Sequence, residues 1–304
     1  MKVLICDPIA EQGVQKLKDA GHEVTVKTGM SPEDLTAFIE PYHAVIVRSA
    51  TKVRKPAIEA GKNLKAIGRG GIGLDNIDVD VAKEKGIAVV NTPGASSISV
   101  AELAIAHMFG LARWVYDSTA SMKEGKWEKK RFMGTELFGK TVGVIGTGGI
   151  GREVIKRCKA LGMKVLTTKR RLNLIPDELK ALDVPVLKLD EMLPQCDIIT
   201  LHLPKASDAG YVIDKPQFDM MKDGVWLVNC SRGGVVSEAA LIEALKSGKV
   251  AKAAIDVYAE EPTHNSELLQ LPNVVLSPHI GASTKEGQLR VGVEIADRII
   301  EALK

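Results

Sequence analysis

The sequence predicts an α/β protein built from two doubly wound domains with parallel sheets, the second inserted into the first. Three observations support this. Short apolar runs alternate with amphipathic stretches along almost all of the 304 residues, a length that suits two domains. The pattern changes at Pro93, and a second series of strands begins near Thr141. Strand–helix alternation with short loops predicts parallel sheets covered by helices on both faces.

The first series of elements precedes Pro93. An amphipathic helix is expected near Ala10–Ala20. Another is expected after Ser31, because Pro32 and Asp34 are typical of a helix N-terminus. The expected strands are Val3–Cys6, Val24–Val26, Ala44–Val47, Lys65–Ile67 and Ala88–Val90.

The second series follows one long helix, expected over Ile98–Lys123, which would connect the domains or pack against a partner subunit. Further helices are expected at Gly151–Leu161, Glu238–Ser247 and Thr284–Leu303. The expected strands are Val142–Ile145, Lys164–Thr167, Ile198–His202, Val225–Asn229, Ala253–Val257 and Val274–Leu276.

The composition excludes several classes of protein. A net charge of +3 and an aromatic content of 4% argue against nucleic-acid binding. Cys6, Cys158, Cys196 and Cys230 are far apart, which fits neither a disulfide framework nor a zinc ribbon, and no residues have metal-ligand spacing. Asp7 comes too early for a signal peptide, and no apolar run is long enough for a membrane span. We therefore expect a soluble, cytoplasmic protein without a metal.

The spacing G-x-G-x-x-G occurs twice, at Gly68–Gly73 and at Gly146–Gly151. The second copy follows a strand and opens a helix, so its glycines would allow a tight turn and close approach of a pyrophosphate. The first copy is followed by Asp75, Asp78 and Asp80, whose charges would repel a pyrophosphate. We interpret the first as a loop for another ligand or a plain turn, and the second as a dinucleotide site.

The segment after the next strand indicates which coenzyme binds. NAD sites carry an acidic residue about 20 positions after the fingerprint begins, to hold the ribose 2′-hydroxyl. Here Thr168 is followed by Lys169, Arg170 and Arg171, and no acid appears before Asp177. Cations suit a 2′-phosphate. A solvated basic loop is the alternative, and we predict NAD(P) binding with NADP favoured over NAD.

Polar residues follow three late strands. Arg232 follows Val225–Asn229, Glu260 and Glu261 follow Ala253–Val257, and His279 follows Val274–Leu276. The carboxyl ends of parallel strands line one crevice, so these groups are expected to meet. A histidine can take a hydroxyl proton, a carboxylate can orient the imidazole, and an Arg fork can bind a substrate carboxylate. The set therefore predicts hydride transfer from a hydroxy acid, with one of the two glutamates a plain loop residue.

The remaining histidines differ in their surroundings. His202 ends a strand near the coenzyme crevice and stays a candidate coenzyme contact. The others are interpreted as structural or surface residues: His22, His43, His107 and His264.

With these residues placed, the sequence resembles the D-isomer-specific 2-hydroxyacid dehydrogenases, and among them is most similar to the D-3-phosphoglycerate dehydrogenases. The resemblance covers nearly the whole chain. The segments that carry it are residues 47–53, 68–78, 91–95, 127–134, 146–151, 229–236, 256–262 and 277–284.

The resemblance implies a Rossmann nucleotide domain, residues 98–284, inserted into a discontinuous flavodoxin-like substrate domain, residues 1–97 and 285–304. It implies a homodimer through the nucleotide domains. It also implies oxidation of 3-phosphoglycerate to 3-phosphohydroxypyruvate, the entry to serine biosynthesis. Because the sequence ends at Lys304, no C-terminal regulatory domain is expected.

The resemblance also assigns roles to single residues. By this resemblance, His279 is the acid/base and Arg232 is the residue that binds the substrate carboxylate. Glu261, rather than Glu260, is the carboxylate partner of His279. Asp256 holds the nicotinamide carboxamide. The substrate residues are Gly70 and Gly71 for the carboxylate and Arg48 and Arg69 for the phosphate, with an ordinary surface role as the alternative for Arg48. The expected coenzyme contacts are Gly146, Gly148, Gly149, Ile150, Gly151, Thr168, Lys169, Arg170, Arg171, His202, Pro204, Cys230, Asp256 and Gly281.

Two other functions stay open. The nearest is reduction of glyoxylate or hydroxypyruvate, or another D-2-hydroxyacid dehydrogenase activity, which a strong NADPH preference would favour. The other is a non-catalytic NAD(P)-sensing binding protein, for which we find no partner-recognition feature.

Overall fold

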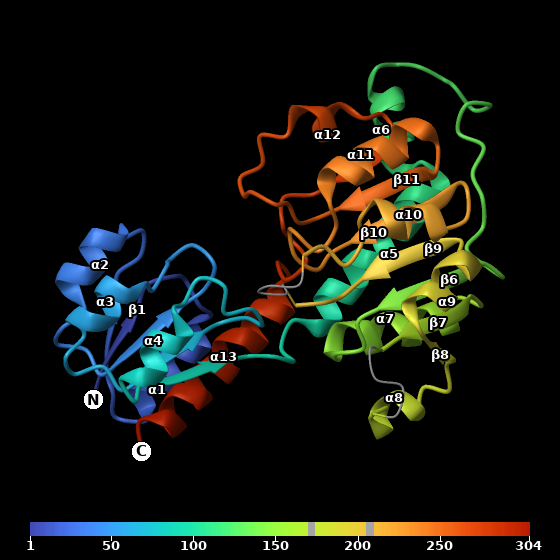
Figure 1. The fold of residues 1–304 in the computed structure, drawn as a ribbon. Helices are drawn as coiled ribbons and strands as arrows, with labels where there is room; N and C mark the ends of the chain where they lie inside the picture. The colour runs from blue at the N-terminus through green and yellow to red at the C-terminus, as the bar shows by residue number, and fades with distance from the viewer. Residues whose placement is uncertain (170–173, 205–209) are drawn as a thin grey trace. The chain divides into compact units, whose positions relative to one another are not determined.

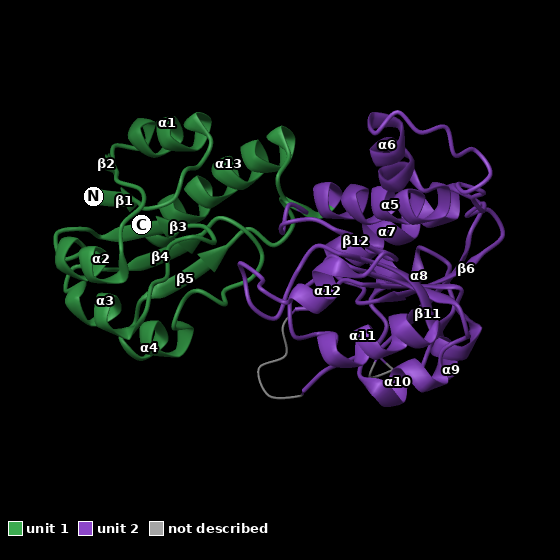
Figure 2. Ribbon diagram, turned by 90° about the horizontal axis from the view of Figure 1, so that it is seen from above, with its two compact units in different colours: residues 1–97, 282–304 green, residues 98–281 purple. Residues whose placement is uncertain are grey.

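The computed structural model describes residues 1–169, 174–204 and 210–304. The chain divides into two compact units (Figure 2). Unit 1 comprises residues 1–97 and 282–304, and unit 2 comprises residues 98–281. The chain therefore re-enters unit 1 at residue 282, slightly before the expected position 285.

Unit 1 contains a five-stranded sheet in the order β2-β1-β3-β4-β5, with every neighbouring pair parallel. This is the flavodoxin-like order, whose topological switch point lies between β1 and β3. Its elements are β1 Lys2–Ile5, α1 Glu11–Asp19, β2 Glu23–Val26, α2 Pro32–Phe38, β3 Ala44–Val47, α3 Lys55–Ala60, β4 Ala66–Arg69, α4 Val79–Glu84, β5 Ala88–Asn91 and α13 Lys285–Ala302.

Alternating side chains of β1 and of the residue after it, Cys6, show how helices cover both faces of this sheet. Val3 and Ile5 belong to a core shared with α1 and α13, whereas Leu4 and Cys6 belong to a core shared with α2, α3 and α4. Figure 2 shows the same two layers on either side of the green sheet. The predicted start of α2 is confirmed, because Ser31 accepts a hydrogen bond from the N–H of Asp34.

Unit 2 contains a seven-stranded parallel sheet in the order β12-β11-β10-β9-β6-β7-β8. Read from β8, this is the Rossmann order 3-2-1-4-5-6 with β12 added at the edge, so the predicted fold class is confirmed. The strands are β6 Thr141–Ile145, β7 Lys164–Thr168, β8 Val186–Leu187, β9 Ile198–Leu201, β10 Val225–Asn229, β11 Val250–Ile255 and β12 Val274–Leu276.

Helices lie on both faces of this second sheet. α10 and α11 share a core with β9, β10 and β11, and Figure 2 shows α5 and α7 on the opposite side. Figure 1 labels most of these elements. The helices are α5 Ser97–Arg113, α6 Val115–Lys123, α7 Gly149–Ala160, α8 Asp177–Lys180, α9 Leu189–Met192, the 3₁₀ turn Leu193–Gln195, α10 Lys215–Met220, α11 Glu238–Ser247 and α12 Ser266–Gln270.

The expected single helix over residues 98–123 was wrong. The chain forms two helices, α5 and α6, bent by 63° at Trp114, whose φ of 56° is in the left-handed region. The indole Nε1–H of Trp114 donates to the carbonyl of Met133, and the ammonium of Lys252 lies 3.5 Å from the centre of its ring. These tertiary contacts stabilise a break that the apolar pattern does not reveal.

Among the described residues, no single helix has both the length and the apolar character needed to cross a membrane. The bent pair α5 and α6 meets those two criteria only when its members are taken together.

Candidate active site

The glycine loop after β6 has the shape of an anion site. Gly148 is the N-cap of α7, and Gly149, Ile150 and Gly151 form its first turn, which contains no acidic residue. A Cβ on Gly151 would lie 1.8 Å from the carbonyl oxygen of Gly146, so only glycine permits this approach. A Cβ on Gly148 would meet no atom of the described residues within 4 Å. The free N–H groups of the helix start can therefore face a pyrophosphate.

The end of β7 lies beside this loop. Thr168 is paired with Ile145, the residue immediately before Gly146. The ammonium of Lys169 donates to the carbonyl oxygen of Leu174 at 3.2 Å. Thr168 and Lys169 are thus placed where the ribose end of a dinucleotide is expected. Arg170 and Arg171, which were predicted to join them, lie outside the described residues.

His202 immediately follows the neighbouring strand β9, and its ring is buried. Its Nε2 lies 2.9 Å from the hydroxyl of Thr200, and its backbone N–H donates to Ile145. Burial lowers the pKa of His202 to about 3, so the ring is neutral. Its Nδ1 has no hydrogen-bond partner within the described part of the chain. A buried nitrogen without a partner, close to the glycine loop, fits a contact with a bound coenzyme.

The other two coenzyme candidates at strand ends differ in exposure. Cys230 follows β10 and is buried, and burial raises the pKa of its thiol. Pro204 is exposed.

Arg232 is held by the turn that follows β10. The side-chain oxygen of Asn229 accepts from both the N–H and the hydroxyl of Ser231, at 3.1 and 2.7 Å. A guanidinium N–H of Arg232 donates to the carbonyl of Ser231 at 2.7 Å. A Cβ on Gly233 would lie 1.6 Å from the carbonyl oxygen of Tyr258. Glycine at this position therefore allows the Arg232 turn to pack against the loop that carries Glu261.

His279 and Glu261 form a direct pair. Nδ1 of His279 lies 2.7 Å from a carboxylate oxygen of Glu261, and the other oxygen accepts from the N–H of Tyr258 at 3.1 Å. Burial acts to raise the pKa of Glu261, but these hydrogen bonds and the nearby positive charge of Arg232 lower it overall. The charged carboxylate accepts from Nδ1–H, which leaves Nε2 of His279 available for a substrate. Of the two adjacent glutamates, Glu261 makes this contact.

Asp256 organises the loop that carries His279. Its buried carboxylate accepts from the hydroxyl of Ser277 at 2.6 Å and from the N–H of Ile280 at 2.9 Å on one oxygen. The other oxygen accepts from the N–H of Gly281 at 2.9 Å. His279 has a φ of 52°, which is uncommon for a residue with a side chain. The bonds on both sides of His279 hold it in this conformation.

In unit 1, two arginines converge on two glycines. Arg48 follows β3 and Arg69 ends β4. The stem of Arg48 lies against Gly70, and the guanidinium of Arg69 occupies the space in front of the Cα of Gly71. Burial lowers the pKa of Arg48. A guanidinium stays protonated in proteins, so this partly buried cation carries a desolvation cost that a bound anion would offset. This arrangement can hold an anion.

The sequence pattern gives Asp7 no role in the site, but in the structure Asp7 positions the Arg48 loop. It is buried at the end of β1 and accepts from the N–H of Arg48 at 2.6 Å. It also accepts from the N–H and the hydroxyl of Thr51, at 3.1 and 2.7 Å. Its place at the switch point between β1 and β3 is the signal that could have identified it.

The described residues contain no group of three or more His, Cys, Asp or Glu side chains that could hold a metal ion.

Two features of unit 2 are typical of dinucleotide-dependent Rossmann proteins. One is the glycine loop at the start of α7, and the other is the set of polar residues at the carboxyl ends of β10, β11 and β12. Residues 105–281 match the family described as D-isomer specific 2-hydroxyacid dehydrogenase, NAD binding domain. The chain belongs to this family, and unit 2 carries its NAD-binding domain.

The chain is similar to known proteins along its whole length. It is 50% identical over 305 residues to the D-3-phosphoglycerate dehydrogenase of Archaeoglobus fulgidus, covering all of this chain and 58% of the relative. It thus spans little more than half the length of that relative. A glyoxylate reductase structure from Paecilomyes thermophila matches with a TM-score of 0.91 and 32% identity, covering 100% of this chain and 95% of that one. A D-lactate dehydrogenase from Aquifex aeolicus, complexed with NAD and lactic acid, matches with a TM-score of 0.86 and 28% identity, covering 98% and 94%.

Proposed function

We propose that the protein is an NAD(P)-dependent dehydrogenase that transfers a hydride between the coenzyme and C2 of a D-2-hydroxy acid. The observation that carries this proposal is the 2.7 Å pair of His279 and Glu261, in the same unit as Arg232 and the Asp256 loop. The family to which the chain belongs supports the same chemistry.

Three side chains have distinct roles in this reaction. Nε2 of His279 takes the hydroxyl proton as C2 becomes a carbonyl, and returns it in the reverse direction. Glu261 accepts from Nδ1–H and so keeps the ring in the tautomer and orientation that expose Nε2. The guanidinium of Arg232 binds the substrate carboxylate and polarises the adjacent oxygen.

We propose that unit 2 holds the coenzyme, whose nicotinamide ring accepts or supplies the hydride when bound. The glycine loop would hold the pyrophosphate, and Thr168 with Lys169 would hold the ribose. Asp256 would accept from the carboxamide, because among the described residues its Oδ2 accepts a hydrogen bond only from the N–H of Gly281, and a carboxylate oxygen can accept two.

We propose a preference for NADP over NAD, since Lys169 stands where an NAD site carries a carboxylate. The comparison of kcat/KM for NADPH and NADH tests this preference. Equal values, or a higher value with NADH, would contradict it. The Lys169→Ala variant should lose efficiency with NADPH and not with NADH.

The best candidate substrate pair is 3-phosphoglycerate and 3-phosphohydroxypyruvate. Two features support it: the convergence of Arg48 and Arg69 on Gly70 and Gly71 in unit 1, and the 50% identity with a D-3-phosphoglycerate dehydrogenase. Unit 1 would then be the substrate-binding domain, with the glycine backbone for the carboxylate and the two arginines for the phosphate.

Initial rates with 3-phosphohydroxypyruvate, hydroxypyruvate and glyoxylate test the substrate. We expect the phosphorylated acid to be reduced with the highest kcat/KM. The Arg69→Ala variant should raise KM for the phosphorylated acid by at least tenfold, because a charge-assisted hydrogen bond contributes about 1.5–3 kcal/mol. Hydroxypyruvate, which lacks the phosphate, is the matched control and should be unaffected.

The second candidate function is reduction of glyoxylate or hydroxypyruvate. The 32% identity with a glyoxylate reductase and the cation at Lys169 favour it. A preference for glyoxylate or hydroxypyruvate would establish this second function. Arg48 and Arg69 would then not be binding a substrate phosphate. Coenzyme binding without turnover of any of the three acids would indicate a sensor instead.

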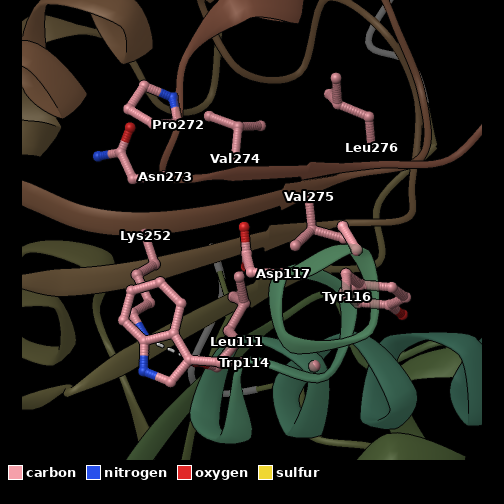
Figure 3. Close-up of a pocket in the computed structure, with 12 residues that line it drawn as sticks. Leu111, Trp114, Tyr116, Asp117, Lys252, Pro272, Asn273, Val274, Val275 and Leu276 are labelled. Atoms are coloured by element: carbon pink, nitrogen blue, oxygen red, sulfur yellow. Dashed lines mark hydrogen bonds between the residues drawn. The ribbon is translucent and has the colours of Figure 1, made fainter. Parts of the chain in front are cut away.

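We propose that the protein forms a homodimer through unit 2. Large apolar side chains are exposed along α5, α6 and the segment that follows. Beside them lies a pocket of about 310 Å³, lined by Trp114 and Tyr116 on the helices and by β12 at the sheet edge (Figure 3). The exposed apolar residues are Phe109, Val115, Tyr116, Met122, Trp127, Met133 and Phe138. A cytoplasmic location stays a prediction.

A further inference from the structure

His107 was interpreted from the sequence as a structural or surface residue, but it is the first member of a buried hydrogen-bond chain. It lies in α5 with only 2% of its surface exposed. Its Nε2 is 3.1 Å from the hydroxyl oxygen of Ser277. That hydroxyl is in turn 2.6 Å from Oδ1 of Asp256. The chain therefore runs from the centre of α5 to the carboxylate that organises the His279 loop.

The direction of each bond in this chain follows from counting protons. The Ser277 hydroxyl has one proton, and the Asp256 carboxylate can only accept, so Ser277 donates to Asp256. The Ser277 oxygen must then accept from His107, whose proton is therefore on Nε2. Nδ1 is left as a bare acceptor, which agrees with its having no hydrogen-bond partner among the described residues. The neutral ring is consistent with burial, which lowers the pKa of His107 despite the opposing charge of Asp256.

The start of α6 lies near this imidazole. The ring of Tyr116, at the start of α6, lies 6.4 Å from the ring of His107, centre to centre. Figure 3 shows Tyr116 beside the bend, at the edge of the pocket. The helix break therefore places an aromatic ring next to the first member of the chain.

We propose that His107 is a positioning residue for the nicotinamide end of the coenzyme, acting through Ser277 and Asp256. Without the Nε2–H donor, the Ser277 hydroxyl loses the bond that orients it and can turn away from Asp256. Oδ1 of Asp256 would then keep one of its two hydrogen bonds, and the carboxylate could rotate. The acceptor position on Oδ2, which the proposed function assigns to the carboxamide, would no longer be fixed. This inference rests on that assignment.

The test compares each complete coenzyme with a truncated ligand that lacks only the nicotinamide. Calorimetry measures the Kd of NADPH and of 2′-phospho-ADP-ribose, and of NADH and ADP-ribose, for the wild-type protein and its variants. The His107→Met variant removes the donor at similar volume. We expect it to raise the Kd of the complete coenzyme about fivefold, the effect of one hydrogen bond. The Kd of the truncated ligand should not change. His107→Gln, which keeps an N–H donor, should recover part of the loss.

Met108→Val is the control for packing, because Met108 is buried in the same helix and lies outside the chain of bonds. It should lower the Tm with no selective effect on the complete coenzyme. If His107→Met does not fold, Ser277→Ala must show the same selective loss. Equal weakening of both ligands, or no weakening, would overturn the inference. If the wild-type protein binds none of the ligands, the proposed function itself fails. This result differs from a failure of the inference alone, in which the wild-type protein binds the coenzyme and His107→Met binds it equally well.

Discussion

At the scale of single residues, the candidate site depends on how neighbouring loops hold the side chains. The Glu261 carboxylate is anchored by Tyr258 on one oxygen and by His279 on the other. Glu238 supports the same loop by accepting from the N–H of Ala259 at 2.7 Å. The protein itself therefore fixes the orientation of the pair, which is what the proposed proton transfer requires.

The His279→Ala variant tests the acid/base role. Removing the imidazole should lower kcat by about 10²–10⁴-fold, because proton transfer from a positioned side chain contributes that much. The Kd of the coenzyme, measured by calorimetry, should stay near the wild-type value. His264→Ala, at an exposed histidine, is the control. Turnover at the wild-type rate in His279→Ala would refute the assignment.

His202 makes a separate prediction about pH. Its folded pKa is about 3, below the ordinary 6.5, so between these values the unfolded chain binds a proton that the folded chain does not. Stability is therefore lost as the pH falls through this window. The contribution amounts to about 2 kcal/mol between pH 7 and pH 5.

Urea unfolding of the wild-type protein and of His202→Gln at both pH values measures this contribution. From pH 7 to pH 5, the unfolding free energy of both proteins should fall, and that of His202→Gln should fall by about 2 kcal/mol less than that of the wild-type protein. His264→Gln is the control. Identical losses in all three proteins would show that His202 is not held neutral by burial.

At the scale of elements, the break between α5 and α6 shows a tertiary contact overriding a helical pattern. The ammonium of Lys252 donates to the carbonyl of Leu111 at 2.7 Å, near the end of α5. It also lies near the rings of Trp114 and Trp226, at 3.5 and 5.3 Å from their centres. A cation bonded to a terminal carbonyl and stacked on an indole stabilises the end of the helix. Figure 3 shows Lys252 and Trp114 side by side.

The junction of β6 and α7 gives a matched pair of variants. Gly151→Ala places a methyl group 1.8 Å from the carbonyl oxygen of Gly146, so the helix must shift. We expect a loss of about 2 kcal/mol in stability and at least a tenfold rise in the Kd of the coenzyme. The methyl group of Gly148→Ala would contact none of the described residues, so this variant should change stability by less than about 0.5 kcal/mol. It should still weaken coenzyme binding, because the pyrophosphate is expected at this position.

Denaturant unfolding and calorimetry separate these two effects. Equal coenzyme affinity in Gly148→Ala and the wild-type protein would place the pyrophosphate elsewhere.

At the scale of the whole molecule, the exposed apolar side chains of α5 and α6 predict the assembly state. Sedimentation velocity should show a particle of twice the 32.7 kDa chain mass. Val115→Glu, in the exposed apolar surface, should dissociate it, because an unpaired charge would be buried in the interface. Val26→Glu makes the same change at an exposed valine of unit 1 and should leave the dimer intact. A wild-type protein that sediments as a monomer would contradict the dimer.

Local patterns in the sequence determined the order of the main strands and helices, and with it both sheets. Strand–helix alternation and the glycine fingerprint specify parallel βαβ units, whose connections leave few possible strand orders. The cap at Ser31 could be predicted for the same reason, because a helix N-terminus is a contact between residues three positions apart. Arg232, His279 and the adjacent pair Glu260 and Glu261 could also be named as candidates in advance, since each follows a strand whose carboxyl end lies at the edge where such sheets bind ligands. The strand pattern did not choose between the two glutamates, and only the family resemblance favoured Glu261.

Tertiary structure alone decided the features that depend on residues far apart in the chain. The bend at Trp114 involves Lys252, the Asp7 carboxylate holds the loop after Arg48, and His107 meets Ser277 across 170 positions of sequence. The periodicity of apolar residues indicates which face of a helix or strand is buried, but it does not indicate which polar group lies opposite that face. The partner of a buried donor or acceptor is set by packing in three dimensions, so these contacts could be identified only once both sides of each one were placed.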